Sequence, residues 1–175
     1  TGFMLNVVHD NMNAFDVHYF SSEMGPSEMN SRLAHFGRPV TKEEWPFNAY
    51  ERSHDFHDMI EGGERKIYII DYVEISNDYW QISGMIRKIH DKLNGAIAII
   101  ALQKNRGAEF GVGGMKSAEK SRLYISMSEH RARFAKVKAW ADPSDNPNGK
   151  VLEYKLRSGC HFSVTRDWHH EEAKK

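Results

Sequence analysis

Three polar side chains stand where buried strands are predicted to end. Glu23 follows the first apolar strand, Asp71 lies at the end of the second, and Gln103 follows the third. The carboxyl ends of parallel strands meet at one edge of a sheet, where α/β proteins bind ligands. A carboxylate that deprotonates water, an aspartate that holds the Mg²⁺ shell and an amide that senses a γ-phosphate are the groups an ATPase needs. The spacing therefore predicts a nucleotide-hydrolysing site.

Each of these residues has a plainer interpretation when taken alone. Glu23 could cap the helix that follows it or interact with the helix dipole. Asp71 could cap a loop, although an acid at the end of an isoleucine-rich strand needs a partner or a metal. Gln103 by itself indicates little. The prediction depends on the three residues occurring together.

The elements that must position these residues alternate along the chain. Four isoleucines and a valine within residues 66–75 indicate a strand buried on both faces. Ile82, Met85, Ile89 and Leu93 recur every three or four residues, as on an amphipathic helix. The full set comprises strands at 15–20, 66–75 and 96–102 and helices at 2–13, 26–35, 48–60 and 82–93. This order predicts an α/β fold with a mainly parallel sheet.

The last third of the chain differs from the rest. Short strands are predicted at 121–128, 133–140, 150–156 and 160–164, with a turn-rich segment at 143–149 that implies a hairpin. We expect one domain over residues 1–164 that ends in an antiparallel ribbon. Residues 165–175 read as a polar, disordered tail.

Composition narrows the functional class. The chain has 175 residues with 24 Lys+Arg and 24 Asp+Glu, which argues against general polyanion binding. No apolar run is long enough to span a bilayer, and no secretion signal is visible at the start. Cys160 is the single cysteine and suits a reducing compartment. We expect a cytoplasmic protein without membrane partners.

Three segments carry a resemblance to a known family: 19–24 (YFSSEM), 69–75 (IIDYVEI) and 99–104 (IIALQK). Together they resemble the RecA-type ATPase core of DnaB-like replicative helicases, in particular the helicase part of phage-type primase-helicases. The resemblance covers nearly the whole chain up to Val164. It implies a RecA-like P-loop NTPase fold that binds ATP and Mg²⁺. Glu23 would be the catalytic glutamate, Asp71 the Walker B aspartate and Gln103 the sensor of hydrolysis.

The resemblance also covers the first residues. Segment 1–6 (TGFMLN) matches the family from the threonine of its phosphate loop onward. Thr1 would then bind Mg²⁺ together with Asp71, whereas the loop's glycines, its lysine and the first core strand are missing. Gly111 to Gly114 is rich in glycine but does not follow a buried strand closely, so it fails as a replacement. This implies that the fragment alone hydrolyses ATP poorly, although its parent would be an ATPase.

Two lysines in the predicted ribbon form a further candidate. Lys136 and Lys138 are two residues apart, so on a strand they project from one face. In the resembling helicases a Lys-x-Arg pair at this place reaches the ATP of the next subunit in a ring. Lysine replaces the usual arginine at Lys138, which keeps the charge but loses the bidentate fork. The alternative is a solvated strand face.

A basic, glycine-punctuated segment follows the third strand. Residues 104–122 hold five basic residues against Glu109 and Glu119. Such a loop suits contact with the backbone of single-stranded DNA, and a plain surface loop is the alternative. The residues proposed for DNA contact are Lys104, Asn105, Arg106 and Lys116.

The resulting hypothesis is an ATP-driven DNA helicase or translocase domain that works as a homo-oligomeric ring. Two alternatives stay open: a RecA-like recombination or plasmid-replication ATPase, and a non-catalytic module whose nucleotide site has decayed. His54 and His57 flank acidic residues but lack a third histidine or a cysteine nearby, so a solvated face is the better interpretation than a metal site.

Overall fold

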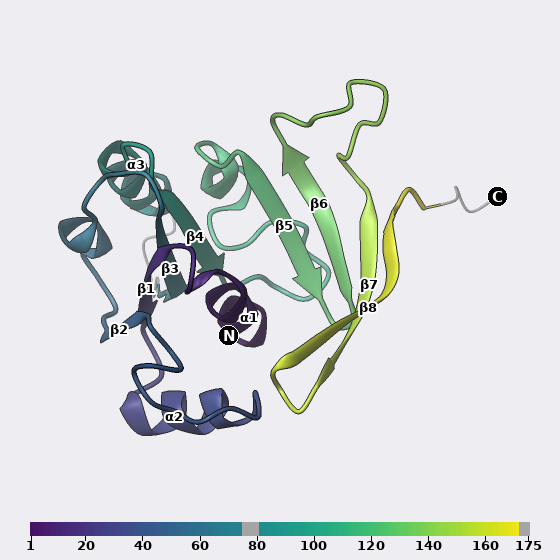
Figure 1. Cartoon of the computed structure of the whole chain (residues 1–175). Helices are drawn as coiled ribbons and strands as arrows, with labels where there is room; N and C mark the ends of the chain where they lie inside the picture. The colour runs from purple at the N-terminus through teal and green to yellow at the C-terminus, as the bar shows by residue number, and fades with distance from the viewer. Residues whose placement is uncertain (75–80, 172–175) are drawn as a thin grey trace.

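The computed structural model describes residues 1–74 and 81–171 (Figure 1). The first half contains a four-stranded parallel sheet with the order β2-β1-β3-β4. Its elements are α1 (Gly2–Asn11), β1 (Asp16–Ser21), α2 (Pro26–Ala34), β2 (Asn48–Glu51), the 3-10 turn η1 (Phe56–Met59), β3 (Lys66–Val73), α3 (Gln81–Lys92) and β4 (Ile97–Leu102). The predicted parallel α/β core is confirmed.

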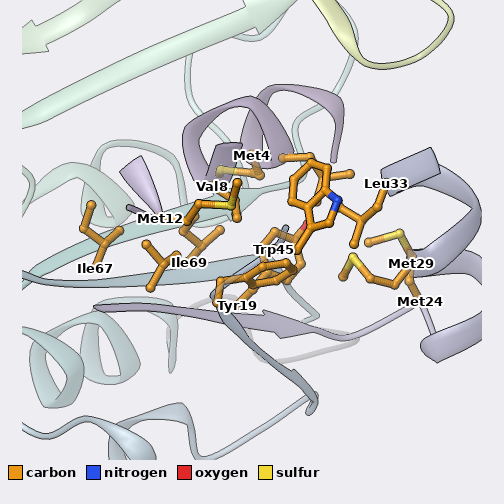
Figure 2. Packing of buried hydrophobic residues seen from close by; sticks show 13 residues of the cluster. Met4, Val8, Met12, Tyr19, Met24, Met29, Leu33, Trp45, Ile67 and Ile69 are labelled. Carbon is orange, nitrogen blue, oxygen red and sulfur yellow. The ribbon is translucent and has the colours of Figure 1, made fainter. Parts of the chain in front are cut away.

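Helices cover both faces of this sheet. Because side chains alternate along a strand, Ile67 and Ile69 of β3 face α1 and α2, whereas Tyr68 and Ile70 face α3 and η1. On the first face Met4, Met12, Met24 and Met29 belong to one buried cluster with Trp45 (Figure 2). Flexible methionines can fill the irregular space between helix and sheet. This face also carries Asp71, a candidate site residue described below, beside Tyr19.

Strand β3 is the centre of the core, which leads to a stability prediction. Ile70 is fully buried, so Ile70→Ala should lower the free energy of unfolding by about 2–5 kcal/mol through lost burial and the cavity left behind. Ile97→Ala on β4 is the matched control, because Ile97 is 49% exposed and its loss should be minor. Urea unfolding of both variants tests this; equal losses would contradict the assignment of the core.

The second half forms a separate four-stranded antiparallel sheet with the order β5-β6-β7-β8. The strands are β5 (Leu123–Ser128), β6 (Arg131–Val137), β7 (Val151–Arg157) and β8 (His161–His169), preceded by the 3-10 turn η2 (Gly114–Ala118). The predicted ribbon and its hairpin are confirmed. Strand β8 runs to His169, so it takes in the first part of the segment predicted as a tail, and residues 172–175 lie outside the described residues.

The helix predicted at 48–60 is wrong. Residues Asn48–Glu51 instead form β2, which extends the parallel sheet beside β1. Tyr50 stacks on Phe20 with the ring centroids 5.2 Å apart, and Asp55 adopts a left-handed backbone conformation that no helix continues. These residues form an edge strand and not a helix because the strand gains backbone hydrogen bonds and aromatic packing from β1. The end of the predicted strand at 66–75 also differs: β3 stops at Val73, and Ile75 lies outside the described residues.

The two sheets each end in an open edge where they approach one another. Among residues 1–74 and 81–171, β4 pairs only with β3, and β5 only with β6. The segment after β4 contacts β5, since Lys104 donates a hydrogen bond to Ser126 and the Gly111 amide donates one to Tyr124. A strand between β4 and β5 would join the two sheets into one. From the family resemblance we expect the strand that leads into the phosphate loop to lie inside the sheet.

Candidate nucleotide site

Asp71 lies at the carboxyl edge of β3 on the face covered by α1. It is 6% exposed, and one carboxylate oxygen, Oδ2, accepts a hydrogen bond from the buried Tyr19 hydroxyl. Its other oxygen, Oδ1, lies 3.6 Å from the Thr1 ammonium nitrogen. Thr1 is the N-cap of α1, so the positive end of the helix dipole also points toward this carboxylate. The structure thus brings together Thr1 and Asp71, which are 70 residues apart in the sequence.

Glu23 lies at the neighbouring strand end. The Tyr72 hydroxyl donates a hydrogen bond of 2.8 Å to Glu23 Oε1, and this bond is the main cause that raises the pKa of Tyr72 to about 12. The Ser22 amide also donates to the Asp71 carbonyl. Helix α2 begins at the N-cap Gly25 without a side-chain cap, so the plainer interpretation of Glu23 as a helix cap does not describe this contact. Glu23 remains exposed at the edge of the sheet.

Gln103 follows β4 at the same edge. Leu102 pairs with Val73, which places Gln103 beside the strand end that carries Asp71. The register between β3 and β4 shifts between Ile70 and Val73, and such irregularities redirect side chains at strand ends. The Gln103 carbonyl accepts a hydrogen bond of 2.8 Å from the Val112 amide, which closes the loop that follows β4. A Cβ at Gly111 would lie 2.9 Å from that carbonyl oxygen, so this closure requires glycine.

Lys136 and Lys138 are distant in the sequence from the residues of this edge. Both contact the end of η2. The Lys136 ammonium donates to the Ala118 carbonyl, and the Lys138 ammonium donates to the Glu119 carbonyl at 3.0 Å. Both lysines therefore hold the end of η2, Lys136 from β6 and Lys138 from the position directly after β6. Partial desolvation and the nearby charges of Lys136, Arg122 and Lys120 lower the pKa of Lys138. This crowding of like charges makes the end of η2 a basic cluster.

The four residues proposed for DNA contact have unequal surroundings. Asn105, Arg106 and Lys116 are polar residues at the surface, the first two in the loop after β4 and the third in η2. Lys104 instead directs its ammonium inward, to the Ala108 carbonyl at 2.9 Å and to the Ser126 hydroxyl at 3.1 Å. These contacts give Lys104 a structural role in closing the loop. The other three are the freer candidates for phosphate contact.

The donor groups at Asp71 are compatible with magnesium. Mg²⁺ is usually held by one or two protein oxygens together with water and substrate phosphates, not by a cage of protein ligands. Asp71 offers such an oxygen beside Thr1, and the described residues contain no cluster of three or more His, Cys, Asp or Glu suited to another metal. No lysine among residues 1–74 and 81–171 forms an ion pair with Asp71 or Glu23.

Comparison with solved structures decides the fold. A DnaB-like replicative helicase, solved in work on its interactions with primase, matches 93% of this chain and 54% of its own with a TM-score of 0.59 and 18% identity. A second solved structure, of an ATPase domain, matches 98% of this chain and 80% of its own with a TM-score of 0.58 and 17% identity. The chain has the RecA-like fold of DnaB-like helicase ATPase domains. It spans about half the length of the first of these two structures.

Other comparisons add no closer relative. No family profile matches the sequence, and no curated protein matches it. Within the described part of the DnaB-like fold, no helix has the length and apolar character needed to cross a bilayer. The likeness therefore lies in the arrangement of the elements, because fewer than one residue in five is identical to either structure.

Two tyrosines of the site were missed by sequence reasoning. Tyr72 directly follows Asp71, and its hydroxyl reaches the other acid, Glu23. Tyr19 stands two residues before the end of β1 and bonds Asp71. A signal did exist for Tyr19, because a tyrosine inside a strand that is buried on both faces needs a partner for its hydroxyl.

Proposed function

We propose that this chain is the ATPase domain of an ATP-driven DNA helicase or translocase of a replication system. The observation that carries the proposal is that Thr1 lies against Asp71, and that Glu23 is bound by Tyr72, the residue after Asp71, at the carboxyl edge of a parallel sheet. This is the edge at which α/β folds bind nucleotides. The cofactors would be ATP and Mg²⁺, and the partner would be single-stranded DNA.

The residues divide the chemistry between them. Asp71 and Thr1 would hold the metal, which supplies charge neutralisation at the phosphates. Glu23 would accept the proton of the attacking water, since it is exposed and lies one strand away from Asp71. Gln103 would sense the γ-phosphate. Loss of that phosphate would shift the loop that is closed by the Gln103 carbonyl. In this way hydrolysis would move Arg106 and Lys116.

Lys136 and Lys138 would act on the neighbouring subunit. In a ring with ATP between subunits, a cationic pair at the rim of the second sheet would stabilise charge on the neighbour's phosphates. The basic cluster at the end of η2 supports this proposal, because Lys136, Arg122 and Lys120 add positive charge around Lys138. A ring-shaped homo-oligomer is therefore the proposed working state.

The proposal is tested with the chain extended by a strand and a G-x-x-x-x-G-K phosphate loop ahead of Thr1. We expect ATP hydrolysis that single-stranded DNA stimulates and that accompanies displacement of a labelled strand from a forked duplex. DNA-stimulated hydrolysis without strand displacement would favour a recombination or plasmid-replication ATPase. Neither nucleotide binding nor hydrolysis in the extended chain would favour the decayed module.

A further inference from the structure

Asp71 accepts a hydrogen bond from Tyr19, which is not one of the three predicted site residues Glu23, Asp71 and Gln103. Tyr19 is fully buried on β1, and its hydroxyl donates to Asp71 Oδ2. Register explains the contact: Tyr19 pairs with Ile69 and Ser21 pairs with Asp71, so Tyr19 and Asp71 are diagonal neighbours on one face of the sheet. Long aromatic side chains reach such diagonal positions.

The surroundings of Tyr19 leave its ring little freedom. Its ring packs edge-on against Phe47 with centroids 6.4 Å apart, within the cluster that also contains Trp45 and Ile69 (Figure 2). Burial is the main cause that raises the pKa of Tyr19 far above its usual value, followed by the charge of Asp71. A buried ring that is packed in place and whose hydroxyl donates to Asp71 is suited to fixing that carboxylate.

The two oxygens of Asp71 thus have different surroundings. Oδ2 accepts a hydrogen bond from a neutral buried donor, whereas Oδ1 lies on the side of Thr1, the N-cap of α1. We propose that Tyr19 is a positioning residue that fixes the Asp71 carboxylate so that Oδ1 alone is presented to a divalent cation. This inference rests on the proposed metal-binding role of Asp71 and adds which oxygen binds and what orients it.

Side-chain rotamers test the positioning directly. In the 175-residue chain, three-bond NMR couplings of Asp71 should show one staggered χ1 state, and Tyr19→Phe should give couplings averaged over several states. Tyr68→Phe is the matched control, because Tyr68 is equally buried but its hydroxyl donates to the Glu61 carbonyl on the other face of the sheet. A single Asp71 rotamer retained in Tyr19→Phe would overturn the inference.

Metal affinity supplies the second readout. We expect Mn²⁺ titration to broaden the amide signals of Asp71 and Ser22 in the wild-type chain, with a midpoint about tenfold higher in Tyr19→Phe, as for other partners that orient metal ligands. In an Asp71→Asn background, Tyr19→Phe should cause no additional weakening of Mn²⁺ binding. A merely structural role of Tyr19 would instead lower thermal stability in a way that does not depend on Asp71.

The outcomes separate the two claims. If Asp71→Asn binds Mn²⁺ as the wild type does, or if the wild type shows no broadening near Asp71, the proposed metal site is wrong and the role of Tyr19 falls with it. If Asp71→Asn loses binding but Tyr19→Phe stays within about twofold of the wild type, well short of the expected effect, only the role of Tyr19 is wrong.

Discussion

The 175-residue chain should hydrolyse ATP on the order of a thousandfold or more slowly than the same chain preceded by a strand and a G-x-x-x-x-G-K loop. That loop supplies backbone N–H groups and a lysine that hold the β- and γ-phosphates. The described residues bring no lysine into ion-pair contact with Asp71 or Glu23. Steady-state phosphate release from the two proteins measures the difference.

The control for this comparison is the extended chain with the added lysine replaced by alanine. It keeps the added strand, which would be able to pair with the edge strands β4 and β5, and removes one expected phosphate contact. We expect it to be nearly as slow as the unextended chain. Helicase-like turnover by the 175-residue chain alone would contradict the account.

The second large effect is expected from Glu23→Gln in the extended chain. Glutamine keeps the size and can still accept the Tyr72 hydrogen bond but cannot take a proton from water. The expected loss in kcat is about 10²–10⁴-fold, the usual contribution of a general base, with ATP affinity unchanged. Single-turnover hydrolysis and a nucleotide-binding titration together separate the two quantities.

A surface glutamate provides the matched control. Glu28→Gln removes the same charge in the first turn of α2, where Glu28 pairs with Arg32 in an exposed i,i+4 ion pair. Exposed pairs of this kind contribute little, so kcat should stay near the wild-type value. If Glu23→Gln kept more than about a third of wild-type kcat, another group would have to be the base.

The core of the fold could be predicted because its sequence patterns are strong. Strand β3 consists largely of β-branched and aromatic residues, and α3 carries isoleucines at 82, 86 and 89 that are buried on one face. The first pattern is a continuous run of residues that favour strands and the second is a helical period, and both are local in the sequence. The edge strand β2 could not be predicted in this way, since its pairing with β1 and the stacking of Tyr50 on Phe20 are tertiary effects.

The site was predictable as a set of strand ends but not as a set of contacts. The nearness of Glu23 and Asp71 follows once β1 and β3 are taken as parallel neighbours. The Tyr19–Asp71 contact depends on the register between these strands, which no local pattern specifies. The contacts of Lys136 and Lys138 with the end of η2 likewise depend on how a turn packs against the second sheet.

The most direct test is the structure of the extended chain with Mg²⁺ and a non-hydrolysable ATP analogue. The account predicts the metal beside Asp71 Oδ1 and Thr1, with the γ-phosphate between Glu23 and Gln103 at the carboxyl edge of β1, β3 and β4. A nucleotide bound at any other place, or Glu23 and Gln103 facing away from its phosphates, would contradict it.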